Sequence, residues 1–308
     1  MMAFDLAAAE TGAGDHLVDA GESARWGVDS EYGRLSDVML SVPRHLEIVP
    51  CNAVSIENHR NGITCSPDLA TRQHVRLVQT LEAEGVRCHF VPPSPDLPDL
   101  SFTRDTTLMT PWGLVGLRPA VRHRLPEVAH VRRAAQAWGV PMLGTIGEGS
   151  IEGGDVCLLR PGLVVIGYSG DRTDRVGAEA LARIFEQRGW RVILTGFDRR
   201  FLHLDTQFTM LDRGRAVARA EGLDADFLLE LQSLGVSIVP SRFDEVQKLG
   251  SNLLSLGGGR LVSPADNERV NAELEQLGYR VIRVEIDQFT RCGGGMHCLT
   301  MPLARLPG

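Results

Sequence analysis

Residues 156–194 read VCLLRPGLVVIGYSGDRTDRVGAEALARIFEQRGWRVIL, and they contain one complete copy of the structural unit from which the fold can be predicted. Its first part holds two apolar runs split by the turn residues RPG, which predict a β-hairpin. From Val176 to Arg188, apolar residues recur at three- and four-residue spacing, which predicts a helix. Gly189 follows, as a left-handed helix cap favours, and WRVIL then predicts a strand. One unit therefore runs strand, strand, helix, strand.

The same unit returns along the chain. Helical patterns over residues 70–84, 128–138, 225–234 and 267–277 each lead into a glycine and a strand-like segment. The five closing glycines are Gly85, Gly139, Gly189, Gly235 and Gly278. Two short apolar runs split by a turn precede each helix, within residues 36–43, 106–117, 156–168, 208–220 and 253–264. Five copies in register predict a repeat architecture.

Five such units around one axis predict an α/β fold, a five-bladed, pseudo-symmetric ββαβ propeller in a single domain. Parallel pairing of each closing strand would make the helix a crossover on the outside. A doubly wound open sheet is the alternative, because it also alternates strands and helices. An open sheet does not need a hairpin in every unit, so the propeller is favoured.

The composition narrows the classes of protein. The chain has 308 residues, 43% hydrophobic and 23% charged, which is typical of a soluble globular protein. A formal net charge of -7 and the lack of a long basic run argue against a nucleic-acid partner. No secretion signal and no apolar stretch of about 18 residues is found, so no membrane association is expected. Six cysteines without a CxxC pair favour a reduced compartment, by default the cytoplasm.

Reactive side chains recur where one unit passes into the next. Closing the ring would bring these junctions toward the axis, although they lie far apart in sequence. The junctions are DLSFTRD (99–105), GSIEGGD (149–155), FLHLDT (201–206), KLGSN (248–252) and TRCGGGMHC (290–298). Alone, Cys298 could fill a core and His203 could be a buried, satisfied histidine. Together, a thiol, an imidazole and several carboxylates at matched junctions predict a catalytic centre.

No metal and no cofactor are expected. The spacing of Cys292, His297 and Cys298 matches none of the usual paired metal-ligand patterns. No GxGxxG fingerprint follows a first strand, and the GGGM segment lacks a Walker lysine.

Four motifs in this order resemble the guanidino-group-modifying, or pentein, superfamily: FTRD (102–105), EGGDV (152–156), HLDT (203–206) and GGGMHC (293–298). That superfamily comprises arginine deiminases, dimethylarginine dimethylaminohydrolases and amidinotransferases. The resemblance covers Arg25 to Arg305 and implies the five-bladed pentein fold, with its active site on the axis. It implies a catalytic domain over residues 25–308. Residues 1–24 would be an N-terminal extension without an assigned role, for which mobility is one interpretation.

The resemblance also implies catalytic roles. Cys298 is the expected nucleophile and His203 the general acid and base. Asp105 and Asp205 resemble the two carboxylates that grip the guanidinium, and Glu152 the acid that supports the histidine and the substrate. Paired carboxylates suit this planar cation because its N–H fork binds them in a bidentate manner.

Four further residues are implied to bind the substrate. Arg124 of RLPE and Arg172 of GDRT resemble the arginines that hold an α-carboxylate, and Phe102 would pack along the substrate. Asp99 stands where the deiminase motif has asparagine, so recognition of the amino-acid end differs from that pattern.

The resemblance is compatible with three reactions. Hydrolysis of arginine or an analogue, through a covalent amidino-thioether, is ranked first, and amidino transfer to an acceptor amine second. Dimethylarginine hydrolysis is third, because those enzymes commonly carry lysine where this chain has Asp205. Bacterial deiminases usually contain an extra helical subdomain, for which these evenly spaced units have no room. The scaffold also serves as a ribosome-subunit-associating factor, a class that predicts no reactive cysteine. The expected partner is a small guanidine, and self-association is left open.

Overall fold

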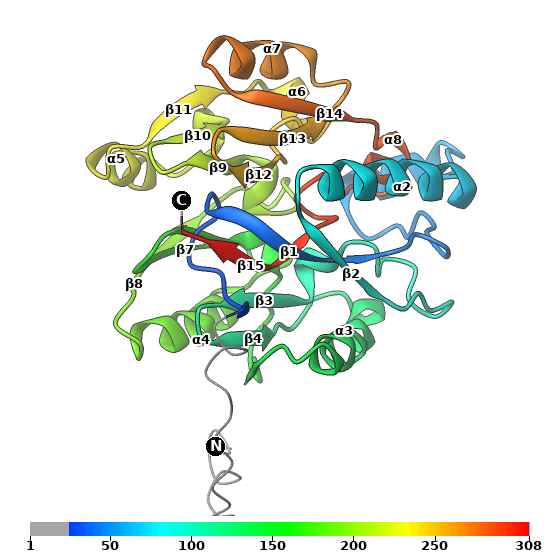
Figure 1. Ribbon diagram of the computed structural model, residues 1–308, viewed down its shortest axis with the longest axis horizontal. Helices are drawn as coiled ribbons and strands as arrows, with labels where there is room; N and C mark the ends of the chain where they lie inside the picture. Colours follow the sequence, from blue (N-terminus) through cyan, green and yellow to red (C-terminus); the bar gives the residue numbers. More distant parts are fainter. Residues whose placement is uncertain (1–24, 308) are drawn as a thin grey trace, which may run out of the picture.

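The computed structural model describes residues 25–307, and the extension predicted over residues 1–24 lies outside them. Five three-stranded sheets and the helices that connect them form one α/β fold (Figure 1). The sheets belong to five pseudo-symmetric ββαβ units, as the repeat pattern predicts. The propeller prediction is therefore confirmed, and the open doubly wound sheet is wrong.

Four of the sheets form from consecutive segments of the chain. In each, the first two strands are antiparallel and the third is parallel to the second. Their strands are β3 (Thr107–Thr110), β4 (Gly113–Gly116) and β5 (Met142–Thr145); β6 (Val156–Arg160), β7 (Leu163–Tyr168) and β8 (Arg191–Gly196); β9 (Phe208–Asp212), β10 (Arg215–Ala218) and β11 (Ser237–Pro240); and β12 (Leu254–Gly257), β13 (Arg260–Pro264) and β14 (Arg280–Val284).

The first sheet takes its strands from both ends of the chain. Strand β1 (Arg34–Ser41) runs parallel to β2 (Arg87–Val91) and antiparallel to β15 (Met301–Leu306). The hairpin expected within residues 36–43 is therefore wrong, because a single strand fills that stretch. The C-terminal strand replaces the missing partner and closes the ring.

Each unit has one crossover helix, close to where its periodicity predicts. These helices are α2 (Pro67–Ala83), α3 (Leu125–Ala137), α4 (Arg175–Glu186), α5 (Ala225–Ser233) and α7 (Glu268–Gln276). The five glycines that follow them all have positive φ, between 75° and 91°. Three short helices were not predicted: α1 (Ala53–Arg60), α6 (Phe243–Gln247) and α8 (Asp287–Thr290). None of the described helices is long and apolar enough to cross a lipid bilayer.

Apolar side chains fill the space between each sheet and its helix. Leu181 and Phe185 of α4, for example, belong to the same buried cluster as Val164 and Ile166 of β7. Burying about two such side chains from each element stabilises a unit by several kcal/mol before the entropy cost of ordering is subtracted. The polar residues of the junctions are excluded from these layers and lie toward the axis.

Candidate active site

Short 3-10 turns at three junctions bring the reactive residues together. They are η2 (Thr103–Asp105), η4 (Gly153–Asp155) and η5 (Leu204–Thr206). The turn η4 contacts both η2 and η5, so segments about 50 residues apart in sequence meet. Asp105 lies in η2, Glu152 directly precedes η4, and His203 directly precedes η5. The matched junctions therefore converge as the repeat predicts.

One small pocket contains most of the predicted site residues. Seven of the nine line it: Asp99, Phe102, Asp105, Arg124, Arg172, His203 and Cys298. Its volume is about 20 Å³, which is room for about one water molecule. Glu152 and Asp205 are not among its lining residues, and Asp205 lines a separate cavity of about 10 Å³. A substrate as large as arginine needs more room than the pocket offers in this conformation.

Glu152 holds the predicted acid-base histidine. Its Oε2 lies 2.8 Å from Nε2 of His203, and its Oε1 accepts a hydrogen bond from the backbone N–H of Ala120. Arg172 Nη1 is 3.5 Å from the same Oε2. On the other side of the ring, Nδ1 of His203 is 3.7 Å from Oδ1 of Asp105. The imidazole thus lies between two carboxylates.

These charges set the protonation of the histidine. Burial lowers the pKa of His203, but the carboxylates of Asp105, Asp155 and Glu152 outweigh it and raise this pKa to about 10. Burial raises the pKa of Glu152, but Arg172 and His203 outweigh it and lower this pKa to about 2. At neutral pH the site therefore holds an imidazolium against an ionised Glu152.

Cys298 lies against an acid and an amide. Its Sγ is 3.8 Å from Oδ2 of Asp205 and 3.5 Å from Nδ2 of Asn252. Burial raises the pKa of the Cys298 thiol well above its ordinary value, and the carboxylates of Asp205 and Asp105 raise it further. The resting sulfur is therefore a neutral thiol. Asp205 also accepts a hydrogen bond from Nδ1 of His297, at 2.8 Å.

The junction KLGSN contains Asn252, for which the sequence predicts no role. In the structure, Asn252 holds the turn that carries Cys298. Its Oδ1 accepts hydrogen bonds from the backbone N–H groups of His297, at 2.8 Å, and Cys298, at 3.4 Å. Its position at a matched junction was the signal that could have marked it. Glu31, by contrast, reaches His297 from the N-terminal segment, and no sequence pattern points to it.

The three glycines before Met296 are explained by the protein's own side chains. A Cβ on Gly294 would lie 2.0 Å from the ring of Phe102, and one on Gly295 would lie 2.4 Å from Oδ1 of Asn252. Gly293 has a φ of 92°, which also disfavours any side chain. These glycines let Phe102 and Asn252 pack directly on the loop of Cys298.

Both predicted carboxylate-binding arginines already have partners. Arg124 donates to Oδ2 of Asp105 at 2.6 Å, to both oxygens of Glu127, and to the backbone oxygen of Phe102. Arg172 donates to the backbone oxygen of Cys51 at 2.5 Å. Their roles toward a substrate stay predictions. To bind a substrate carboxylate, each arginine would have to give up one of its present hydrogen bonds or share it with the substrate.

Three buried polar atoms around Cys298 lack a hydrogen-bond partner among the described residues. They are Oδ1 of Asp105, Oδ1 of Asp205 and Nδ1 of His203. Unpaired buried polar atoms are costly, and a ligand that binds between them can supply the missing partners.

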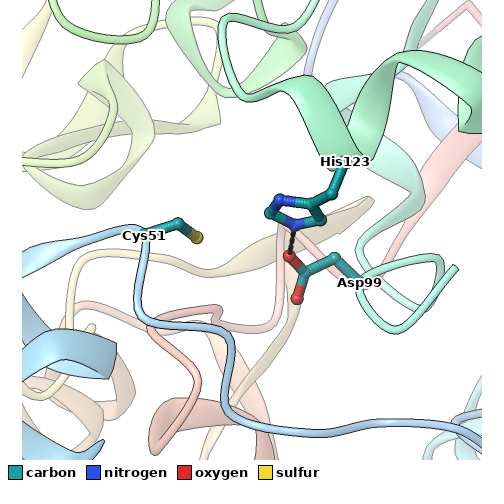
Figure 2. Close-up of side chains that lie close together, drawn as sticks. All are labelled: Cys51, Asp99 and His123. Atoms are coloured by element: carbon teal, nitrogen blue, oxygen red, sulfur yellow. Dashed lines mark hydrogen bonds and ion pairs between the residues drawn. The ribbon is translucent and has the colours of Figure 1, made fainter.

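Two groups of described side chains have donor atoms close enough to hold a metal ion. Asp105, Glu152 and His203 form one, and the ion pairs given above account for its arrangement. Cys51, Asp99 and His123 form the other at the pocket's edge, and the sequence did not mark Cys51 or His123 (Figure 2).

Known proteins match most of this chain. The pattern of the arginine deiminase family matches residues 91–237 and 232–305. An arginine deiminase of Mycobacterium marinum is 32% identical over 257 residues, covering 68% of this chain and 61% of that enzyme. An N(G),N(G)-dimethylarginine dimethylaminohydrolase of Streptomyces coelicolor is 28% identical over 238 residues, covering 77% of this chain and 87% of that enzyme.

Solved structures share the fold. The N-terminal domain of ArgZ, an arginine dihydrolase of cyanobacteria, matches with a TM-score of 0.77 and 20% identity, over 88% of this chain and 98% of that one. Dimethylarginine dimethylaminohydrolase of Pseudomonas aeruginosa matches with a TM-score of 0.73 and 22% identity, over 87% and 99%. Both matches show that the five-unit architecture is a known fold.

Proposed function

Because the chain belongs to the arginine deiminase family, whose members and fold support hydrolysis at a guanidino group, we propose that it hydrolyses arginine or an arginine analogue. Cys298 attacks the guanidino carbon, and a covalent amidino-thioether forms. Water then releases a citrulline-type product. The nitrogen that leaves is ammonia or, from a substituted guanidine, an amine.

One observation carries this proposal: two acids, Asp105 and Asp205, whose charges act on Cys298, each have a buried oxygen that accepts no hydrogen bond within the described residues. Oδ1 of Asp105, which lies 3.7 Å from Nδ1 of His203, and Oδ1 of Asp205 are buried acceptors without a hydrogen-bond donor in the described part of the chain. A guanidinium offers a planar fork of N–H donors and a positive charge. It would therefore supply the missing hydrogen bonds of the two acid oxygens and balance their negative charge. The position of Asp205, 3.8 Å from Sγ of Cys298, would put the guanidino carbon within reach of the sulfur.

Substrate charge starts the reaction. As the cation enters, it offsets the negative charge of Asp105 and Asp205, so the thiol pKa of Cys298 falls and its proton leaves to solvent. The thiolate bonds to the guanidino carbon. The C–N bond then breaks, and the imidazolium of His203 gives its proton to the departing nitrogen.

The second half reverses these roles. His203, now neutral, takes a proton from water, and the resulting hydroxide attacks the amidino carbon. The C–S bond breaks and Cys298 leaves as a thiolate. The added hydroxyl loses its proton as the carbonyl of the product forms, and the thiolate takes up a proton again when the product departs. Glu152 keeps the ring oriented throughout, since it bonds to Nε2 and leaves Nδ1 for the transfer.

The substrate reaches the sulfur only if the pocket widens. Cys51 and Asn52 line it from the segment between β1 and α1. Gly293 and Leu202 line it from two other connections. We infer that displacement of the Cys51 segment admits the substrate. Two hydrogen bonds hold it at the pocket, from Arg172 to the carbonyl of Cys51 and from Asn52 to the carbonyl of Cys292, and both would have to break.

A competing function also has support. This chain covers 87% of the Streptomyces dimethylarginine dimethylaminohydrolase but 61% of the Mycobacterium arginine deiminase. The length match favours dimethylarginine hydrolysis, whereas the acid at Asp205 favours an unsubstituted guanidinium. Amidino transfer uses the same covalent intermediate with an amine in place of water.

A substrate panel tests the proposal. The protein is incubated with arginine, methylated arginines and other guanidines, with and without an acceptor amine, and products are measured by mass. Ammonia with citrulline supports the proposal, whereas methylamines or a new guanidino compound would replace it with one of the other reactions. Cys298→Ala should abolish turnover, and Cys88→Ser, at a half-buried cysteine in β2, should not. Turnover that survives Cys298→Ala would refute the mechanism.

A further inference from the structure

Three side chains of different chemistry meet at the edge of the catalytic pocket. Figure 2 shows the thiol of Cys51 pointing toward the paired side chains of Asp99 and His123. Nε2 of His123 lies 2.6 Å from Oδ2 of Asp99, and one donor atom of each residue lies within 4.8 Å of the others. Asp99 is buried, while Cys51 and His123 are half-buried, so the cluster is reachable from solvent.

The donor set is the one that zinc prefers. Thiolate, imidazole and carboxylate are its usual protein ligands, and sites with three of them leave a fourth position open. In a tetrahedral site, ligand atoms stand about 3.3–3.7 Å apart for bonds of about 2.0–2.3 Å. The cluster would have to adjust by up to about 1 Å. The paired atoms of Asp99 and His123, at 2.6 Å, are closer than this range, and the sulfur of Cys51 lies within 4.8 Å of a donor atom of each. Side-chain rotation suffices for shifts of that size.

The backbone of two of these residues is already anchored. Arg172 Nη2 donates to the carbonyl of Cys51 at 2.5 Å, and Arg124 Nη2 lies 3.4 Å from the carbonyl of Asp99. These contacts hold the backbone of two of the three donor residues in place. The two arginines are themselves paired with acids, Arg124 with Asp105 and Arg172 with Glu152, which limits their repulsion of a cation.

We propose that Cys51, Asp99 and His123 form an inhibitory site for a divalent metal of the zinc class. Binding exchanges the thiol proton of Cys51 and the hydrogen bond between Asp99 and His123 for three bonds to the metal, and the proton leaves to solvent. The bound metal ties the segment of Cys51 to the connections that carry Asp99 and His123. Substrate entry is blocked, because Cys51 and Asp99 line the pocket of Cys298.

The test measures metal binding apart from turnover. The full-length protein competes with a chromophoric chelator for Zn²⁺, and Co²⁺ loading is followed by the thiolate-to-cobalt charge-transfer band. The measurements are made in a Cys298→Ser background, so that the catalytic sulfur cannot be the ligand. We expect one metal per chain. Cys51→Ser and His123→Ala should each weaken binding at least about tenfold, since loss of even an outer-shell partner costs about 10–100-fold.

Controls separate this site from the rest of the protein. Cys65→Ser, at another half-buried cysteine, should bind metal normally, and circular dichroism melts should show that every variant is folded. In the chain with Cys298 intact, Zn²⁺ should inhibit turnover, and Cys51→Ser should raise the inhibiting concentration at least about tenfold. Binding that survives Cys51→Ser, or that disappears in Cys298→Ser, would overturn the proposal. Since binding is read without substrate, its failure leaves the proposed hydrolysis untouched.

Discussion

At the scale of single residues, buried charges decide the state of the site. His203 is an imidazolium because carboxylates surround it, and its pKa is raised to about 10. Asp105 belongs also to the pair of acids that keeps Cys298 a thiol, since the pKa of this thiol is raised well above the ordinary value by burial and then by Asp205 and Asp105. A cation that binds between the acids relieves both effects, so the nucleophile forms only when substrate is present.

Alkylation of Cys298 should therefore depend steeply on pH. We expect slow reaction with neutral iodoacetamide at neutral pH and faster reaction as the pH rises, because only the thiolate attacks and its pKa is raised. A cationic haloacetamidine should react faster at neutral pH, since its charge offsets the two carboxylates. Mass spectrometry of the modified peptide measures both rates.

Asp205→Asn provides the matched control. Removing this negative charge lowers the thiol pKa of Cys298, so the iodoacetamide profile should move to lower pH. An unchanged profile, or equal reactivity of all six cysteines, would contradict the electrostatic explanation.

Asn252 should act as a positioning residue. Asn252→Ala removes the oxygen that accepts from the backbone of His297 and Cys298, so the sulfur loses its fixed position. We expect kcat to fall about 100-fold, the cost of a misplacement of about 1 Å, with KM little changed. Steady-state kinetics measure the split, and a thermal melt shows whether the fold persists. A rise in KM alone would point to substrate binding instead.

At the scale of elements, backbone conformation ends each helix and directs the chain inward. The five glycines after the crossover helices have left-handed φ values, which other residues adopt only at a cost. From there the chain forms the closing strand and, in three units, a 3-10 turn that delivers a reactive side chain. The repeated caps thus explain why residues of distant units reach equivalent positions.

Gly189→Ala tests the cap by itself. Gly189 has a φ of 75° and open space around it, so an added Cβ strains the backbone without a clash. We expect the free energy of unfolding to fall by about 1 kcal/mol, the left-handed cost less the gain from a stiffer unfolded chain. Gly147→Ala, which has open space without positive φ, should leave stability unchanged or slightly higher. Equal losses at both positions in denaturant titrations would refute the argument.

At the scale of the whole molecule, the ring is closed by the two ends of the chain. Strand β15 pairs with β1, from Arg34 opposite Leu306 to Met39 opposite Met301. Cys298 lies three residues before β15, so the strand that closes the fold also anchors the predicted nucleophile. Stability and the geometry of the site are coupled through this strand.

Leu303→Ala should therefore lower the stability of the fold and disturb the geometry of the site. Leu303 is fully buried in β15, and its truncation should lower the free energy of unfolding by about 2–5 kcal/mol. Leu306→Ala, in the same strand but 41% exposed, should change it by less than about 0.5 kcal/mol. Chemical denaturation measures the free energy of unfolding of both variants. Comparable losses would show that burial of Leu303 in β15 does not stabilise the fold more than an exposed position of the same strand.

Sequence periodicity by itself determined the units of this protein. Helical spacing from Val176 to Arg188, the glycine that follows and the turn-separated runs before it are local signals, because they depend on neighbours within about one element. Five repetitions then specified the propeller. The junction motifs contain seven of the nine predicted site residues, and five of these seven line one pocket. Arg124 and Arg172, which the family resemblance added, line it too. Equivalent positions of a closed ring of repeats meet near its axis. Motifs recognised locally at the junctions could therefore be predicted to lie close together in space.

Only the tertiary structure decided which distant groups meet. The pairing of β15 with β1, the contact of Asn252 with the backbone of Cys298 and the meeting of Cys51 with Asp99 and His123 join segments from about 24 to more than 250 residues apart. The periodicity of apolar residues along the sequence does not predict contacts between such distant segments. They depend on how the packed elements orient each side chain, and so do the protonation states of His203 and Cys298, which the field of the assembled site sets.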